Sequence, residues 1–428
     1  MREEARIANA RRRRLARVAR GRVRALEVCS LHSERGIQAA SSSYEATYTG
    51  SPRPRSFETF ARSHPRPAHL PFPPHTSTMS NSPLLLLAMG NPLLDMSVTD
   101  APELLEKYNL KPNDAVLAEG KQSEIYDDLQ KNYKVLYVAG GAAQNCARGA
   151  QYVLPEGSTA YLGCVGSDSL ADQLRAANDR EGLQSAYQVV EDKPTGACAV
   201  VITGHNRSLC TTLGAAESFS PSHLSKPEIA SLIDRAQNFY LGGFFLTHGL
   251  ESALILAKHA AEKNKPFAMN LSAPFIPQFF KSQVDEMLPY VDVLIGNESE
   301  AQAYADSHEW NTKDLAEIAT KLASLPKKNS SLPRLVVITQ GSESTIVASS
   351  SPSDSGLSSS PKTYPVSKLP SSAIVDTNGA GDAFAGGFLG ARAMGKSVDE
   401  SVEVGHKLGA MCVGLNGPSF KFPKVNVL

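Results

Sequence analysis

Short apolar runs recur along this 428-residue chain, and each ends in a polar or glycine turn that opens a segment of helical character. The runs at 84–89, 238–241, 267–270, 291–295 and 334–338 each suit one buried strand. Strands that are apolar throughout are typical of parallel sheets, which helices cover on both faces. The pattern therefore predicts an α/β fold with a central, mostly parallel sheet flanked by helices. Its ligand site is expected at the carboxyl ends of the strands.

Residues 1–79 differ from the rest of the chain in charge and composition. They contain 15 arginines and 6 glutamates but no lysine or aspartate, and the remainder is correspondingly acidic because the whole chain has no net charge. A proline-rich run at 52–74 cannot pack a core. We expect a disordered basic and proline-rich extension over 1–79 and one folded domain over 80–428. Its acidic balance argues against a nucleic-acid groove.

Three interpretations of the extension are open. An arginine-rich, serine-containing segment resembles a mitochondrial transit peptide, but it can also be a disordered tail, or translation can begin at Met79. No run of 18 apolar residues occurs, so no membrane span is expected. Six scattered cysteines match neither a disulfide framework nor a zinc site. The chain is expected in the cytoplasm, with the nucleus as a further compartment, rather than in mitochondria.

Short β-prone runs between 187 and 213 interrupt the α/β rhythm, and Gly204-His-Asn-Arg207 separates two of them as a hairpin turn. A small sheet inserted into an α/β chain indicates a lid that excludes water from a site. We expect that lid to come from roughly 95–135 and 187–213. The serine-rich stretch at 349–361 is expected to be a flexible surface loop.

The stretch Asp376-Thr-Asn-Gly-Ala-Gly-Asp382 indicates a site of its own. It follows a strand-like run at 373–375 and opens an apolar helix rich in small residues. Unpaired amides of residues 379–381 at a helix N-terminus favour an anion. Asp382 is placed to accept a proton from a hydroxyl that attacks a phosphate. The alternative for such a motif alone is a capped helix with a glycine turn.

Polar side chains stand where the apolar runs end. Asn91 and Asp95 flank two leucines and can hydrogen-bond a polyol, although their spacing is also common turn chemistry. Asn297 and Glu300 have a spacing that suits either a hydrated Mg²⁺ near phosphates or a capping box. The other polar groups expected at this edge of the sheet are Asn270 and Thr339. Asn145, one turn into the helix that follows Gly140-Gly141, is expected to face a ligand, and a glycine turn that only packs is the alternative.

These motifs together resemble a known family. Asp376 to Asp382, with Gly386-Gly387 downstream, resembles the second signature of the ribokinase-like carbohydrate and nucleoside kinases, and Gly140-Gly141 with Asn145 resembles the first. The adenosine-kinase branch of that family is indicated by strings spread over about residues 84–422. They include Gly-Asn-Pro-Leu-Leu-Asp95, Pro-Thr-Gly196, Gly-Phe-Phe-Leu-Thr247 and Asn-Leu-Ser-Ala-Pro-Phe275.

The resemblance implies phosphorylation of the adenosine 5′-hydroxyl by ATP, with Mg²⁺, in purine salvage. Asp382 would be the general base, and the amides of Gly379, Ala380 and Gly381 would hold the transferred phosphoryl group. The residues implied at the nucleoside are Asn91, Leu93, Asp95, Gly140, Gly141, Asn145, Cys198, Leu213, Phe245 and Asn378. Those implied at ATP are Arg207, Asn270, Thr339, Gly341 and His406, with Asn297 and Glu300 serving Mg²⁺ through water.

Two departures from the family pattern bear on affinity and selectivity rather than on the reaction. Ala142-Ala143 stands where animal members have Ser-Thr, and His205 stands where an acid precedes Asn-Arg207. A ribokinase-like sugar kinase and a non-catalytic nucleoside-binding regulator are the alternative functions. The apolar set around Leu93 favours a purine over a free sugar, and an intact Asp382 favours catalysis. We expect a monomer that binds adenosine and ATP, without nucleic acid or membrane.

Overall fold

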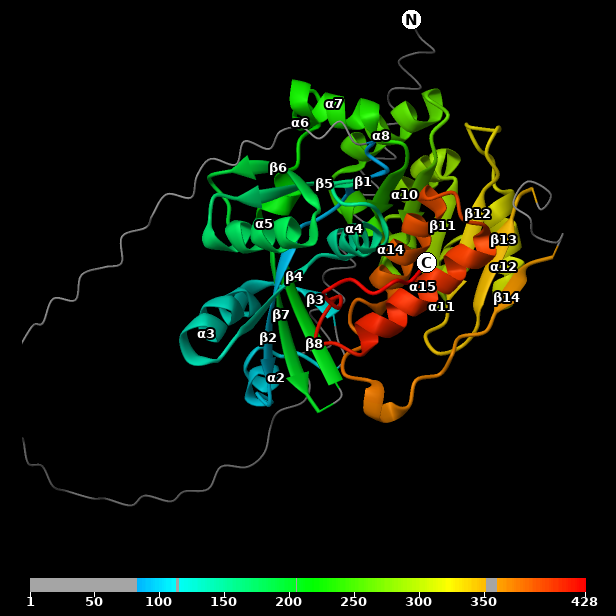
Figure 1. Cartoon of the computed structure of the whole chain (residues 1–428). Coiled ribbons are helices and arrows are strands. Elements are labelled where there is room, and N and C mark those ends of the chain that lie inside the picture. Colours follow the sequence, from blue (N-terminus) through cyan, green and yellow to red (C-terminus); the bar gives the residue numbers. More distant parts are fainter. Residues whose placement is uncertain (1–82, 113–114, 205, 352–359) are drawn as a thin grey trace, which may run out of the picture. The chain divides into compact units, whose positions relative to one another are not determined.

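The computed structural model describes residues 83–112, 115–204, 206–351 and 360–428 (Figure 1). The extension expected over 1–79 and most of the serine-rich loop expected over 349–361 lie outside these residues. The described residues form two sheets, one of nine strands and one of five. None of their helices is long and apolar enough to cross a membrane.

The large sheet has the strand order β14-β13-β12-β11-β10-β9-β1-β5-β6. The strands from β6 to β12 in this order are parallel, and β13 and β14 are antiparallel additions at one edge. The expected α/β fold with a mostly parallel sheet is confirmed. The strand bounds are β1 Leu86–Met89, β5 Thr159–Gly166, β6 Gln184–Val190, β9 Phe239–Gly242, β10 Phe267–Asn270, β11 Val293–Asn297, β12 Leu335–Thr339, β13 Thr345–Ser349 and β14 Lys362–Tyr364.

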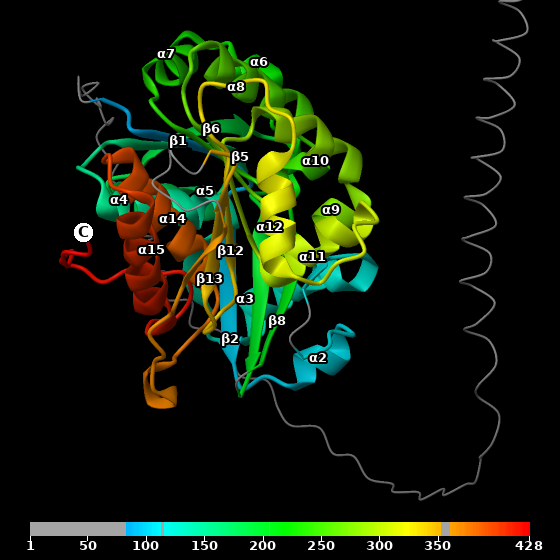
Figure 2. The ribbon, with the colours of Figure 1, turned by 90° about the vertical axis from the view of Figure 1, so that its right-hand side faces the viewer.

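Helices cover both faces of this sheet, and Figure 2 shows α4, α14 and α15 on the opposite side from α8 to α12. The first layer consists of α4 Ala142–Val153, α5 Ser169–Glu181, α14 Ala380–Ala393 and α15 Val398–Val413. The second consists of α6 Pro221–Leu224, α7 Pro227–Arg235, α8 Leu250–Glu262, α9 Phe275–Phe279, α10 Lys281–Met287, α11 Glu298–Ser307 and α12 Leu315–Ser324. Short 3₁₀ helices are η1 Gly120–Glu124, η2 Gly214–Ser218, η3 Gly243–Thr247, η4 Leu288–Tyr290 and η5 Ser371–Ala373.

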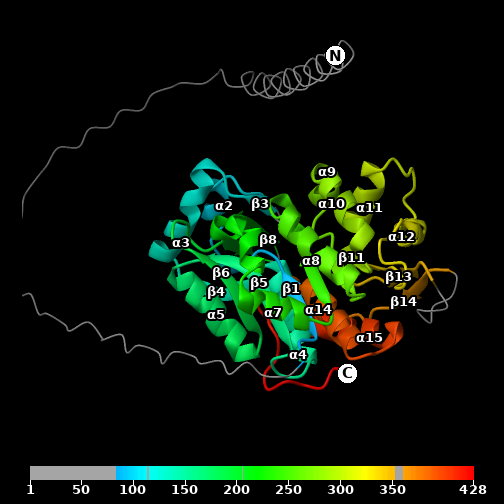
Figure 3. The ribbon, with the colours of Figure 1, turned by 90° about the horizontal axis from the view of Figure 1, so that it is seen from above.

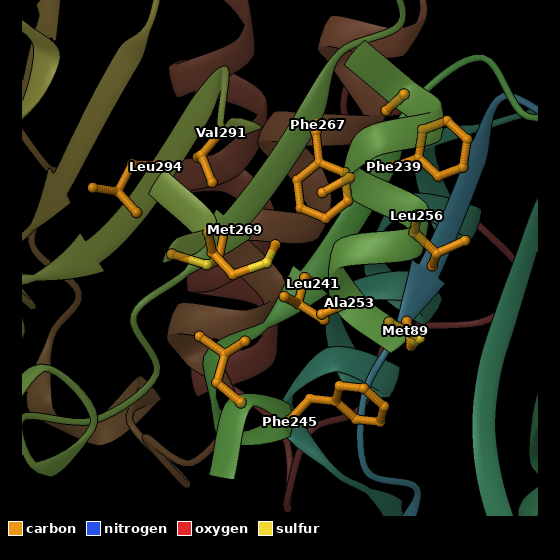
Figure 4. Packing of buried hydrophobic residues seen from close by; sticks show 14 of the residues in the cluster. Met89, Phe239, Leu241, Phe245, Ala253, Leu256, Phe267, Met269, Val291 and Leu294 are labelled. Carbon is orange, nitrogen blue, oxygen red and sulfur yellow. The ribbon is translucent and has the colours of Figure 1, made fainter. Parts of the chain in front are cut away.

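Alternate residues of each strand enter different cores. In β1, Leu87 and Met89 pack with Phe239 and Phe267 beneath the second layer of helices (Figure 4). Leu86 and Ala88 belong instead to the core that α4 and α14 cover. Because successive side chains point to opposite faces and both faces are buried, such strands appear in the sequence as continuous apolar runs.

The small sheet has the order β3-β8-β7-β2-β4 and its own apolar cluster, to which helices α2 and α3 contribute. Figure 3 shows both helices beside β3 and β8. β7 and β8 pair antiparallel with Thr203 opposite Asn206, so the chain reverses at Gly204 as expected. The bounds are β2 Leu93–Thr99, α2 Glu103–Lys107, β3 Ala115–Leu117, α3 Ile125–Asn132, β4 Leu136–Gly140, β7 Ala197–Thr203 and β8 Asn206–Thr212.

Two local expectations are wrong. The run at 187–190 was expected in the small sheet, but it belongs to β6, which pairs with β5 of the large sheet. Ala186 and Tyr187 of this strand enter the two cores on opposite faces of that sheet. The strand-like run at 373–375 forms no strand. Its first residue, Ala373, ends η5, and Ile374 and Val375 are 45% and 48% exposed. The Val375 amide donates to Val413 O of α15 rather than to a neighbouring strand.

Helices α4 and α14 approach each other through glycines. A Cβ built on Gly386 would lie 2.5 Å from Cys146 O and 2.8 Å from Ala150 N, both on the α4 backbone. A Cβ on Gly149 would lie 3.4 Å from the Cα of Gly386. Only a residue without a side chain fits at 386, and this close packing brings the first turns of the two helices together.

Candidate active site

Asp382, in the first turn of α14, meets Asn145, in the first turn of α4. Asn145 Nδ2 donates to Asp382 Oδ2 at 3.0 Å, although the residues are 237 positions apart. Burial raises the pKa of Asp382 to about 7, and the bond from Asn145 opposes that rise. Asp382 as a residue is partly exposed. A carboxylate with a pKa near 7 suits a general base at neutral pH.

The turn before α14 is held by Asp376, which is 4% exposed. Its Oδ1 accepts from the Asn378 amide at 2.7 Å and its Oδ2 from the Gly417 amide at 2.9 Å. Gly379 has a φ of 77°, and a Cβ there would lie 2.5 Å from Pro418 Cβ. The segment around Pro418 therefore packs against the glycine turn and supports it from outside.

The helical ladder of α14 begins after this turn. Ala383 N donates to Gly379 O at 2.8 Å, while Ala380 N closes a turn onto Thr377 O at 3.3 Å. The N-terminus of α14, with Gly381 exposed and Asp382 beside it, carries the positive end of the helix dipole. An anion and a base can therefore meet here.

Asp95 lies on β2 and is 7% exposed. Burial raises its pKa to about 7, the charge of Asp382 adds to the rise, and Arg148 lowers it. A Cβ on Gly140, in the neighbouring strand β4, would lie 2.3 Å from Asp95 Oδ1. Gly140 therefore leaves the space that the carboxylate occupies.

Asn91 is held from two sides. Gly141, at a φ of 85°, approaches so closely that a Cβ there would lie 2.3 Å from Asn91 O. His248 Nε2 lies 2.9 Å from Asn91 Oδ1. Burial lowers the pKa of His248 to about 4, so the ring is neutral at pH 7. Asn91 Nδ2 is buried without a hydrogen-bond partner among the described residues, and it is free to donate to a ligand.

The polar residues at the strand ends lie along one edge of the large sheet. Asn270 is the register partner of Gly242, and Asn297 is the partner of Thr339. Asn270 Oδ1 accepts from Ser272 N at 2.9 Å, and Gly341 has a φ of 57°. His406 lies on α15, where its Nε2 is 2.9 Å from Thr345 Oγ1.

Asn297 and Glu300 form a capping box at the start of α11. Asn297 Oδ1 accepts from Glu300 N at 2.9 Å, Glu300 Oε2 accepts from Asn297 N at 3.0 Å, and the side chains bond each other at 2.9 Å. Burial raises the pKa of Glu300 to about 7. The described residues contain no cluster of three or more His, Cys, Asp or Glu that could hold a metal. This pair fits Mg²⁺ only through water, with phosphates as the main ligands.

The apolar residues implied at the base differ in exposure. Leu93 and Leu213 are partly exposed and flank Gly196, where a Cβ would lie 2.6 Å from Leu93 Cδ2 and 2.7 Å from Leu213 O. Cys198 is buried and accepts from Thr211 Oγ1 at 3.2 Å. Phe245 has no exposed surface and packs in the main core, because the 3₁₀ turn η3 directs it inward. Its neighbour Phe244 is partly exposed.

Arg207, near the tip of the β7–β8 hairpin, contacts the turn before α14. Its Nε lies 2.5 Å from Asp376 Oδ1, and its Nη2 donates to Val375 O at 3.1 Å. The sequence led us to expect this arginine at phosphates. In the structure it joins the small sheet to the glycine turn.

Sequence reasoning missed three side chains and one segment that contribute to the site. Arg148 follows Asn145 by three residues, so helical spacing could have placed it on the same face. Asp376 was seen only as the first residue of a motif, and His248 carried no signal beyond its position after a strand end. The support that the 416–420 segment gives to the glycine turn depends on tertiary packing, which no local pattern reveals.

Comparisons with known proteins agree with this geometry. The model of the pfkB family carbohydrate kinases matches residues 103–425. An adenosine kinase of Schizophyllum commune is 56% identical over 345 residues, covering 80% of this chain and 98% of that protein. One of Schizosaccharomyces pombe is 48% identical over 345 residues, again covering 80% of this chain and 98% of the relative.

A solved structure of similar fold is Anopheles gambiae adenosine kinase in complex with a di(adenosine-5) tetraphosphate. It is 42% identical, has a TM-score of 0.74, and the match covers 78% of this chain and 97% of that one. With the site geometry described above, these similarities establish that the chain belongs to the pfkB family of carbohydrate kinases and, within it, to the adenosine kinases.

Proposed function

We propose that the chain transfers the γ-phosphoryl group of ATP to the 5′-hydroxyl of adenosine, giving AMP and ADP, with Asp382 as general base. The observation that carries the proposal is the position of Asp382. A carboxylate whose pKa is about 7 lies at the N-terminus of α14, and it accepts a hydrogen bond from Asn145 of α4. Base, anion site and polar ligand groups meet there.

The nucleoside is held by groups on β2 and α4. Asp95 accepts from the ribose hydroxyls, and Asn91 Nδ2, which has no partner among the described residues, donates to a ribose oxygen. Leu93, Leu213 and Cys198 cover the purine. Phe244 rather than Phe245 provides the aromatic surface, because Phe245 is completely buried. The 5′-hydroxyl then faces Asp382, which takes its proton as the oxygen attacks the phosphorus.

ATP lies along the carboxyl edge of the large sheet, bordered by Asn270, Thr339, Gly341 and His406. Charge that develops on the transferred group is stabilised by the amides of the α14 turn and by the helix dipole. Attack and departure occur in line within one ternary complex, so no covalent enzyme intermediate is needed. Asn297 and Glu300 would hold Mg²⁺ through water, and the cation would offset the negative charge of the phosphates.

The small sheet acts as a lid over the nucleoside. Its support is the contact of Arg207 with Asp376, which joins the β7–β8 hairpin to the glycine turn. When phosphates occupy the turn, Arg207 is near enough to exchange a carboxylate for a phosphate oxygen. The lid comprises the strands of the small sheet with α2 and α3, while 80–428 forms the folded domain.

The cytoplasm is the compartment we favour, because the five cysteines in the described part of the chain are buried and free. The protein acts as a monomer without nucleic acid or a membrane.

The test is a coupled assay of ADP formation by the full-length protein with Mg-ATP and adenosine, ribose or fructose. Adenosine turnover that Asp382→Asn lowers by several orders of magnitude, with adenosine still bound, supports both substrate and base. Turnover of ribose or fructose without turnover of adenosine would mean that the acceptor is a sugar and not a nucleoside. Tight binding of adenosine by the wild type without turnover would identify a nucleoside-binding regulator.

A further inference from the structure

Arg148 lies on α4, three residues after Asn145, and is 3% exposed. It forms a bidentate ion pair with Glu181 at the end of α5, with Nε 2.8 Å from Oε2 and Nη2 2.7 Å from Oε1. A buried charge of this kind needs every one of its donors satisfied. The pair with Glu181 uses only Nε and Nη2 of the guanidinium.

The other side of the guanidinium faces the site. Nη1 donates to Ala139 O at 2.8 Å, to Pro418 O at 3.0 Å, and makes a longer contact of 3.4 Å with Asn145 Oδ1. Ala139 is on β4 of the small sheet, directly before the glycine that accommodates Asp95. One side chain therefore links the small sheet, the 416–420 segment and the helix that bears Asn145.

The contact with Asn145 selects one orientation of its amide. A guanidinium has donors and no acceptor, so the amide atom that faces it must be the oxygen. The amide nitrogen is then directed to Asp382, where it donates to Oδ2 at 3.0 Å. With the amide reversed, an oxygen would face the carboxylate and raise its pKa further.

The contact with Pro418 supports the anion turn. Pro418 packs against Gly379, where a Cβ would lie 2.5 Å from Pro418 Cβ, and the neighbouring Gly417 donates to Asp376 at 2.9 Å. Holding Pro418 O therefore holds the segment that the glycine turn rests on. Arg148 touches neither the reacting atoms nor the substrates as we place them.

We propose that Arg148, buried against Glu181, is a positioning residue that orients Asn145 toward Asp382 and fixes the 416–420 segment beneath the glycine turn. The inference rests on the proposed function, because it assigns Arg148 a part in the ionisation and alignment of the proposed base. A positioning role and a purely structural role of Arg148 differ in one measurable respect. If Arg148 positions Asn145, its loss changes the pH dependence of kcat/KM as well as the stability of the fold.

The decisive variant is Arg148→Met with Glu181→Met, which removes both buried charges together and leaves neither unpaired. Such exchanges of a buried ion pair for apolar residues are often neutral for stability. We expect kcat with adenosine to fall roughly 10- to 100-fold, as misplacement of reacting groups predicts. The acidic limb of the pH profile of kcat/KM should move to higher pH. Activity needs ionised Asp382, and the pKa of Asp382 rises when Asn145 no longer donates to it, while Asp95 loses the direct lowering by Arg148.

The charge of Asp382 raises the pKa of groups on several elements that surround it. They are Asp95 on β2, Cys146 on α4, Tyr161 on β5, Tyr240 on β9, Glu300 on α11 and Cys412 on α15. Glu300 titrates in the same range as Asp382, but Arg148 is not among the groups that shift its pKa. Asp95 also has a pKa of about 7, and Arg148 lowers it, so the change at Asp95 adds to that at Asp382 in the same direction.

A matched control removes a buried ion pair away from the site. Lys327 and Asp292 have side chains that are 9% and 4% exposed, and Lys327→Met with Asp292→Asn should leave the acidic limb of the wild type in place. If the decisive variant does not fold, as judged by thermal unfolding, Arg148→Lys decides instead. It keeps the charge but cannot reach all four partners, so we expect a smaller loss of kcat and a measurable shift of the limb.

Wild-type kcat and an unmoved acidic limb in either folded Arg148 variant would overturn the inference. So would a shift of equal size in the control variant. Failure of the proposed function gives a different result, because the wild type would then not turn over adenosine or would be insensitive to Asp382→Asn.

Discussion

The Nε of Arg207 lies 2.5 Å from Oδ1 of Asp376, and this ion pair connects the hairpin of the small sheet with the turn that opens α14. Asp376 also accepts from two backbone amides, so it stays partly satisfied without the arginine. We expect Arg207→Met to fold but to raise the KM for ATP and lower kcat/KM roughly 10-fold, about 1.4 kcal/mol. Steady-state kinetics measure this. Lys368→Met is the control, because its pair with Glu343 is exposed and such pairs contribute little. Equal effects of the two substitutions would contradict the prediction.

Gly141→Ala should impair the site more than its backbone strain alone explains. A left-handed conformation costs a non-glycine residue about 1–2 kcal/mol, and Gly157→Ala, at a φ of 70° with nothing within 4 Å of its Cβ, measures that cost by itself. At Gly141 the new Cβ also meets Asn91 O at 2.3 Å. We expect similar or greater destabilisation, together with a kcat/KM for adenosine more than about 10-fold lower, while Gly157→Ala retains activity.

Asp382→Asn should stabilise the protein at pH 8 but not at pH 4. The pKa of Asp382 is raised from 3.8 to about 7 in the native state. Between about pH 4 and 7 the unfolded state therefore releases its proton first, and native stability falls as pH rises. The three-unit shift sets a ceiling of about 4 kcal/mol, and partial exposure reduces the expected gain to roughly 1–2 kcal/mol.

Thermal unfolding across this pH range tests the sign, with Asp128→Asn as a contrasting control. The bond from Lys107 lowers the pKa of Asp128 to about 2. The contribution of Asp128 to native stability is therefore present above about pH 4 and is lost as the pH falls below it. That substitution should destabilise at pH 8 and not stabilise. A uniform gain for Asp382→Asn at every pH would exclude an ionisation effect.

His248→Leu should raise the KM for adenosine about 3- to 10-fold and change kcat less. His248 lies 2.9 Å from Asn91 Oδ1, and without it the amide is free to rotate away from the nucleoside. Loss of one hydrogen bond that positions a ligand group corresponds to about 1 kcal/mol. His248→Gln, which can still donate, should restore part of the affinity. Steady-state kinetics measure KM and kcat, and isothermal titration with adenosine measures the affinity of both variants. Unchanged affinity in His248→Leu would mean that Asn91 is held in place without His248.

The sequence predicted the fold and the strand ends because both depend on local chemistry. Apolar runs that end in polar turns suffice to locate β9 to β12, and the bounds of β10 agree at both ends. The run at 373–375 shows where this reasoning fails. Its composition suits a strand, but its amide bonds to α15 instead of a strand, and only tertiary context decides that.

Individual residues of the site were predicted less evenly. Asn145 and Asp382 were each recognised as ligand or base candidates, but nothing in the sequence showed that they contact each other. The family resemblance implied that Phe245 lies at the purine, but the 3₁₀ turn η3 directs it into the core. The capping box formed by Asn297 and Glu300 was foreseen as an alternative because that interaction is local.

The glycines at 149 and 386 have a consequence for how the reaction distance is maintained. Asn145 and Asp382 belong to different helices, and those helices touch backbone to backbone. The distance between Asn145 and Asp382 is therefore set by main-chain contact, which repacking of nearby side chains cannot alter. One methyl group at 386 would widen it. The spacing of these two polar side chains is thus encoded by the absence of side chains at 149 and 386.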